Sequence, residues 1–162
     1  MKKLFLAIIM LVSCCVCSAC DPAMFEPEES TPYATDDMPR HTVGEVIESS
    51  GFEIEYLSFD KRDELTDGYV AKDGYDYYVF EFEFKNISDT EKHVYYGCFG
   101  CYADGVWVEQ TYNYDGIIKG NLVDNGDKTK GTVAFMVPEN AKLVEMIFQY
   151  RVEDERLVFS VE

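Results

Sequence analysis

The alternating stretch "YYVFEFEFKN", residues 77–86, constrains the fold more than any other part of this chain. Four aromatic residues take every second position, and mostly charged residues stand between them: Tyr78, Phe80, Phe82 and Phe84 against Val79, Glu81, Glu83 and Lys85. Because successive side chains of a β-strand point to opposite faces, this period of two predicts a strand with one buried and one solvated face.

Three further stretches alternate in the same way: "GFEIEYLSF" (51–59), "GTVAFMVP" (131–138) and "RLVFSVE" (156–162). A fourth, "ENAKLVEMIFQY" (139–150), fits both helix and strand spacing, and we expect a strand because it is short and lies between strand-like neighbours. Clusters of Asp, Asn and Gly, such as "ADG" and "DNGDKTKG", suit tight turns between these segments. The pattern predicts an all-β fold, an antiparallel β-sandwich, over residues 43–162.

The N-terminal residues 1–19 are typical of an export signal. Two lysines precede the apolar run "LFLAIIMLV" (4–12), which is too short to cross a membrane core of about 30 Å as a helix. Four cysteines follow within "SCCVCSAC" (13–20), inside or directly behind this run, where a structural zinc site has no folded scaffold. We interpret the stretch as a bacterial lipoprotein signal with Cys20 as the lipidated residue and Cys14 as the alternative, against an ordinary secretory signal with incidental cysteines.

Acidic residues dominate the chain, with 31 Asp and Glu against 14 Lys and Arg and a net charge of −17. Such a chain repels nucleic-acid phosphates and anionic lipid headgroups, so we expect no nucleic-acid partner and membrane contact through the lipid alone. Residues 21–42 hold four prolines and six acids without apolar periodicity. We expect residues 20–42 to be the lipid-attachment cysteine followed by a disordered acidic linker.

Four motifs follow one another along the chain: "VGEVIESSGFEIEYLSF" (43–59), "DYYVFEFEFKNISD" (76–89), "CYADGVWVEQTYN" (101–113) and "GDKTKGTVAFMVPENAKLVEMIFQY" (126–150). Their order resembles the DUF4352-type lipoprotein domain, an immunoglobulin-like family common in Gram-positive bacteria, and the resemblance covers nearly all of residues 43–162. It implies a secreted or lipid-anchored immunoglobulin-like β-sandwich, with no shared catalytic residues to carry over.

No catalytic constellation emerges from the residues. His41 lies in the linker and His93 follows "DTEK", so no set of Ser, His and Asp can be assembled, and we expect neither an enzyme nor a cofactor. Carboxylates such as those of "FDKRDELTDG" (59–68) are too abundant to single out an acid and a base. No calcium-loop spacing is present, so we assign no metal ligands, although calcium bound between acidic loops stays open as an alternative.

Cys98 and Cys101 in "YGCFGCYADG" remain after lipidation of Cys20. Three positions apart on a regular strand, they point to opposite faces, but Gly97 and Gly100 permit a bulge that turns them together. A structural disulfide, free thiols with at least one buried, and a redox pair are the three alternatives.

Trp107, the chain's only tryptophan, is the leading candidate for a binding surface. Alternation after the Asp104-Gly105 turn assigns Val106 and Val108 to the core face, which leaves Trp107 exposed, with Tyr112 and Tyr114 as neighbours. The opposing interpretation is a buried tryptophan, as immunoglobulin-like sandwiches often have.

Together these features predict a lipid-anchored module on the extracellular face of the cell membrane, of Gram-positive type, which binds a protein or an envelope component. The alternative is a receptor domain for a small ligand or a metal ion such as calcium.

Overall fold

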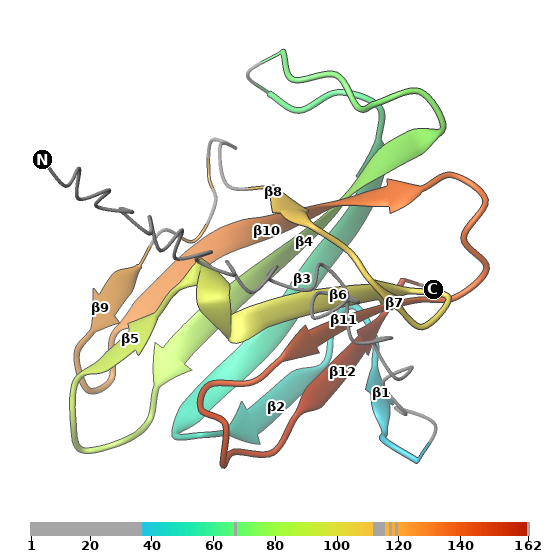
Figure 1. Cartoon of the computed structure of the whole chain (residues 1–162). Helices are drawn as coiled ribbons and strands as arrows, with labels where there is room; N and C mark the ends of the chain where they lie inside the picture. Colours follow the sequence, from blue (N-terminus) through green and yellow to red (C-terminus); the bar gives the residue numbers. More distant parts are fainter. Residues whose placement is uncertain (1–36, 67, 112–115, 117, 119, 162) are drawn as a thin grey trace, which may run out of the picture.

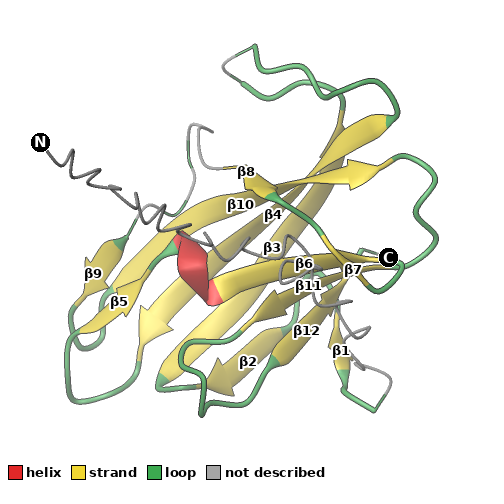
Figure 2. Cartoon of the chain, viewed as in Figure 1, coloured by secondary structure: helices red, strands yellow, loops and turns green. Residues whose placement is uncertain are grey.

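A computed structural model of the protein describes residues 37–66, 68–111, 116, 118 and 120–161. Two five-stranded sheets stack face to face (Figure 1). The first has the order β1-β12-β11-β6-β7, and the second has the order β2-β3-β4-β10-β8. A two-stranded sheet, β5-β9, extends one end, and the one helical element among the described residues is a 3-10 turn at Tyr96–Cys98 (Figure 2).

The strands of the first sheet are β1 (Arg40–His41), β12 (Leu157–Ser160), β11 (Val144–Phe148), β6 (Phe99–Ala103) and β7 (Val106–Trp107). Those of the second are β2 (Val46–Ser49), β3 (Phe52–Arg62), β4 (Tyr75–Asn86), β10 (Lys128–Pro138) and β8 (Gln110–Thr111). The small sheet pairs β5 (Lys92–Val94) with β9 (Asn121–Val123). All pairs are antiparallel except β1 with β12, which confirms the all-β sandwich predicted from the alternation.

Aromatic side chains from both sheets meet in the core. Phe82 on β4 packs against Phe159 on β12 and Phe99 on β6, with ring centroids 5.0 and 5.8 Å apart. Tyr56 on β3 stacks on Phe82 at 5.0 Å, and its buried hydroxyl donates to the carbonyl oxygen of Ser160 at 3.1 Å. Burial of this phenol raises its pKa above the ordinary value near 10. The predicted inward face of residues 77–86 is therefore confirmed.

The ambiguous segment 139–150 contains strand β11, as expected, and no helix. The inward residues expected for segments 51–59 and 131–138 are all fully buried: Phe52, Ile54, Tyr56, Val133, Phe135 and Val137. A shift in register between Tyr56 and Ser58 interrupts the alternation of β3, and Phe59 then packs against Tyr78 and Phe80.

Two expectations need correction. The folded part begins before residue 43, because Arg40–His41 forms β1 and pairs in parallel with Val158 and Phe159 of β12. Val106 was assigned to the core face but is 62% exposed, whereas Val108 is buried. The reason is that β7 is a two-residue edge strand beside the tight turn at Asp104-Gly105, so Val106 projects past the end of the core.

Candidate functional site

The hairpin of β6 and β7 places Trp107 on the surface of the first sheet. Asp104 and Gly105 both have positive φ, 51° and 80°, and form the two-residue turn that joins the strands. Trp107 pairs with Tyr102 across the hairpin, with their rings edge to face at a centroid distance of 5.4 Å. Trp107 is 53% exposed, as the alternation predicted, and its role in binding stays a prediction.

The tip of this hairpin is fixed by Asp104. Its carboxylate Oδ1 accepts hydrogen bonds from the backbone N–H groups of Lys142 at 3.0 Å and Leu143 at 2.9 Å. Its own backbone N–H donates to the carbonyl oxygen of Leu143 at 2.8 Å. The turn that carries Trp107 is thus tied to the connection between β10 and β11, which limits its motion.

Gly100 on β6 lets the indole lie close to the sheet. A Cβ atom at this position would come within 2.5 Å of indole Cζ3 of Trp107, closer than any side chain tolerates. Gly100 pairs with Ile147 of β11, and Ile147 in turn pairs with Val158 of β12. This row of apolar residues crosses the outer face of the first sheet, a face that polar side chains usually occupy in a sandwich.

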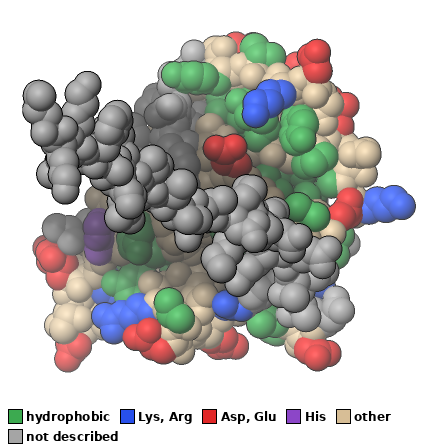
Figure 3. Space-filling model, in the orientation of Figure 1, with side chains coloured by type: hydrophobic (Ala, Val, Ile, Leu, Met, Phe, Trp, Pro, Cys, Tyr) green, Lys and Arg blue, Asp and Glu red, His purple; other side chains and the backbone are tan. Residues whose placement is uncertain are grey.

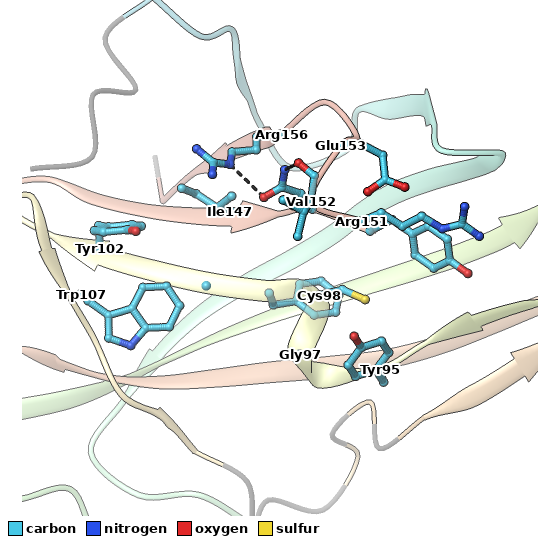
Figure 4. A pocket seen from close by; sticks show the side chains of 14 residues that line it. Tyr95, Gly97, Cys98, Tyr102, Trp107, Ile147, Arg151, Val152, Glu153 and Arg156 are labelled. Carbon is cyan, nitrogen blue, oxygen red and sulfur yellow. Dashed lines mark hydrogen bonds between the residues drawn. The ribbon is translucent and has the colours of Figure 1, made fainter. Parts of the chain in front are cut away.

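A hollow of about 570 Å³ opens beside Trp107 along β6. Figure 4 shows Trp107 and Tyr102 toward one end, Tyr95 toward the other, and the side chains of Arg151, Val152, Glu153 and Arg156 along the opposite wall. Gly97 and Gly100 line the hollow beneath these aromatic residues: the ring of Tyr95 lies so close to Gly97, and the indole of Trp107 so close to Gly100, that a Cβ atom at either glycine would clash. The combination of aromatic side chains, close-packed glycines and a polar wall is suited to ligand binding.

The polar wall is a loop, residues 149–156, held by Gln149. The Gln149 amide Nε2 donates to the carbonyl oxygens of Val152 and Asp154, both at 3.0 Å. Arg156 Nε donates to Oε1 of the same amide at 2.9 Å, as the dashed line in Figure 4 marks. The guanidinium of Arg151 lies 5.6 Å from the ring centroid of Tyr150. These contacts order the wall without any bound molecule.

A second hollow of about 440 Å³ lies on the other side of the hairpin. Its lining includes Tyr75, Val106, Met136 and Pro138, together with Trp107. Trp107 therefore contributes to the lining of both hollows. Figure 3 shows hydrophobic side chains gathered in the upper right of the displayed face, with acidic and basic side chains around them.

Cys98 and Cys101 are both free thiols and both buried, which corresponds to the second of the three alternatives. Cys98 is the last residue of the 3-10 turn and lines the first hollow, and Cys101 faces the core from β6. Burial raises the pKa of each thiol above its ordinary value. The reactive thiolate form is therefore disfavoured at neutral pH, which argues against a redox pair.

Four residues singled out in the sequence lie outside the described residues: the candidate lipidation residues Cys20 and Cys14, and the expected neighbours of the tryptophan, Tyr112 and Tyr114. Among the described residues Trp107 has the neighbours Tyr102 and Gly100, which the sequence pattern did not single out for it. The signal for them was the glycine and tyrosine content of "YYGCFGCY" (95–102), interpreted only for its cysteines.

The two histidines lie on different sheets, His41 on β1 and His93 on β5. His41 Nδ1 lies 2.9 Å from Oε2 of Glu45, and this contact lowers the pKa of Glu45. The ring of His93 packs against Tyr95. Within the described ranges, no three His, Cys, Asp or Glu side chains come together as a metal site would require, and no helix is long and apolar enough to cross a membrane.

No protein-family model matches the chain, and no curated protein matches it in sequence. Several solved structures share its fold, and at these low identities the similarity shows the fold alone. The candidate lipoprotein ycdA of Bacillus subtilis has a TM-score of 0.59 and 11% identity over 71% of this chain and 38% of its own. The secreted protein MPT63 of Mycobacterium tuberculosis has a TM-score of 0.56 and 12% identity over 76% of this chain and 98% of its own.

A third structure, a β-sandwich protein of Clostridium difficile, has a TM-score of 0.51 and 18% identity over 76% of this chain and 95% of its own. The chain thus has the antiparallel β-sandwich fold of a group of bacterial proteins that includes a secreted protein and a candidate lipoprotein.

Proposed function

We propose that the protein is a lipid-anchored, non-catalytic binding module on the extracellular face of the cell membrane, and that it binds a component of the cell envelope through the surface around Trp107. The observation that carries this proposal is the environment of Trp107. Its side chain is half-exposed, packs closely over Gly100 and lines two hollows. A large aromatic side chain left on the surface of a rigid hairpin is typical of interaction sites.

The proposed location rests on the sequence of residues 1–20, which combines a basic start, an apolar run and "CSAC". The sharing of the fold with a candidate lipoprotein and a secreted protein supports it. Diacylation of one cysteine supplies more than one chain, which stable anchoring requires. The DUF4352-type resemblance agrees with this location and remains part of the proposal.

The anchor is tested in cells that express the full chain and are fed radiolabelled palmitate. We expect label on the wild-type protein and on Cys14→Ser, and none on Cys20→Ser. Label on Cys20→Ser but not on Cys14→Ser would show that the lipid is attached to Cys14. Two results would contradict an anchor at these positions: label on both variants, or no label on any of the three proteins.

The binding role is tested by retention of the full-length protein, solubilised in detergent, on cell walls stripped of membrane. We expect the wild type to be retained and Trp107→Ala to be released. Val46→Ala is the matched control, because Val46 is an exposed apolar residue on β2 of the other sheet. Equal retention of all three proteins would contradict a role for the Trp107 surface.

A small-ligand receptor is the second candidate, because the hollow of about 570 Å³ falls within the range of small-molecule sites. In that case a low-molecular-weight extract of the envelope, rather than the wall polymer, would compete for the Trp107 surface. A calcium-binding role finds no support in the described residues, where no cluster of three or more ligating side chains occurs.

A further inference from the structure

The chemistry of the two hollows narrows the class of ligand. Trp107 lines both hollows, of about 570 and 440 Å³, so a ligand that extends from one into the other would pass beside the indole. A chain of linked units fits this arrangement better than one compact molecule does. One unit would contact the indole, and its neighbours would occupy the hollows.

Charge excludes two classes of ligand. The chain has a net charge of −17, which opposes the approach of a polyanion such as a phosphate-linked polymer. Inside the first hollow Arg151 and Arg156 outnumber Glu153, which disfavours a cationic ligand. The second hollow has the opposite balance, with Asp104 and Glu109 against Lys72, which disfavours an anionic one. A neutral ligand avoids both of these unfavourable charge interactions.

The strand edges beside the hollows argue against a peptide that adds a strand to the sheet. Such a peptide gains most of its affinity from main-chain hydrogen bonds along an exposed edge. Strands β7 and β8, next to the hollows, have only two residues each. They offer few main-chain groups for a partner strand.

We propose that this site binds a neutral oligosaccharide, with one sugar ring stacked on the indole of Trp107 and the adjoining rings in the two hollows. The C–H face of a sugar ring is apolar and slightly positive, and it complements the negative face of an aromatic ring. Hydroxyl groups around the ring are donors and acceptors for the carboxylate of Glu153 and the guanidinium of Arg151. This inference rests on the proposed function, since it names the chemistry of the same surface.

The test uses the full-length protein in a polyoxyethylene detergent, which has no sugar headgroup. Three neutral tetrasaccharides serve as probes: β-1,4-linked N-acetylglucosamine, β-1,4-linked glucose and α-1,4-linked glucose. Calorimetry measures binding, and the emission of Trp107, the only tryptophan, reports contact with the indole. We expect at least one tetrasaccharide to bind saturably and to shift this emission.

Two variants test the geometry. Trp107→Ala should weaken binding by about tenfold or more, which corresponds to the loss of about 1.4 kcal/mol. Gly100→Ala should also weaken binding although the tryptophan is kept, because the new methyl group would lie 2.5 Å from the indole and displace it. Val46→Ala should bind as the wild type does. Should Gly100→Ala fail to fold, Trp107→Phe replaces it, and an affinity between those of the wild type and Trp107→Ala is expected.

The outcomes separate this inference from the proposed function. If cell walls retain the protein through Trp107 while none of the three tetrasaccharides binds, the binding module stands and the oligosaccharide is overturned. Displacement from walls by a proline decapeptide, with no displacement by the tetrasaccharides, would likewise overturn it in favour of a peptide. Saccharide binding that is equal in wild type, Trp107→Ala and Gly100→Ala would place the ligand elsewhere and overturn the proposed site.

Discussion

Arg40 reaches across strand β12 to the buried carboxylate of Glu145 on β11. Both Nε and Nη2 of the guanidinium donate to Oε1 of Glu145, at 3.1 and 2.6 Å. The Glu145 side chain is only 6% exposed, whereas that of Arg40 is 34% exposed. The first strand after the linker is therefore fastened to the sheet by an ion pair as well as by its pairing with β12.

Arg40→Ala should lower the free energy of unfolding by about 1–3 kcal/mol, because it removes two hydrogen bonds from a carboxylate that is largely shielded from water. Urea unfolding of the full chain at pH 7 measures the effect. Lys130→Ala is the control, since Lys130 forms an exposed pair with Glu81 at 3.1 Å and such pairs contribute less than about 1 kcal/mol. Equal losses in the two variants would show that the pair of Arg40 and Glu145 stabilises no more than a surface pair does.

Phe82→Ala should cost about 3–5 kcal/mol of unfolding free energy, because Phe82 is fully buried among rings from both sheets. Glu83, the next residue along β4, points to the solvated face and pairs with Lys128. Glu83→Ala should therefore cost less than about 1 kcal/mol. Similar unfolding midpoints for the two variants would contradict the register of β4.

Asn86, at the end of β4, is fully buried and organises the turn that follows. Its side-chain Nδ2 donates to the carbonyl oxygens of Thr90 and Val123 at 2.7 and 2.8 Å, and Oδ1 accepts from the backbone N–H of Ser88 at 2.9 Å. Asn86→Ala should lower the unfolding free energy by about 2–4 kcal/mol, since it removes three hydrogen bonds made by a fully buried side chain. Thermal unfolding measures the loss.

Asn125→Ala is the matched control for Asn86→Ala. Asn125 makes one exposed hydrogen bond, from Nδ2 to the carbonyl oxygen of Ser88 at 2.6 Å. Its removal should cost less than about 1 kcal/mol. A loss as large as that of Asn86→Ala would mean that burial of Asn86 is not what gives the turn its stability.

Cys98 and Cys101 should resist alkylation by iodoacetamide until the protein unfolds, because both thiols are buried and burial raises their pKa values. The unfolded thiols ionise near pH 8.5, and the folded ones at higher pH. Their contribution to stability is thus complete below about pH 8.5 and is lost as the pH rises further. Mass spectrometry of the two cysteine peptides, before and after unfolding, measures the labelling; a disulfide-linked peptide would contradict the free thiols.

The sequence predicted the sandwich because its core is patterned residue by residue. The alternation of Phe80, Phe82 and Phe84 follows from strand geometry alone, and the structure buries all three completely. The exposure of Trp107 followed from the same rule. For these residues, local spacing and tertiary environment agree.

The same rule failed at Val106, where the strand is two residues long and its neighbour across the sheet ends at the turn. The rule predicted Trp107 but not its surroundings, because Gly100 and the 149–156 loop come to the same hollow as Trp107 only through the pairing of β6 with β7 and β11. Pairing partners depend on the topology of the whole sheet, which local spacing does not encode. The ion pair of Arg40 and Glu145 could not be predicted from the sequence for the same reason, because it depends on the pairing of β12 with β1 and β11.

Acrylamide quenching of Trp107 shows whether a ligand covers the indole, since no other tryptophan contributes to the emission of the chain. The full-length protein is measured alone and with solubilised cell-wall fragments, and Trp107→Phe supplies the blank for emission from the fragments. We expect ready quenching of the free protein and clear protection once the fragments are added. Strong protection already in the free protein, or quenching unchanged by saturating fragments, would contradict a binding surface at Trp107.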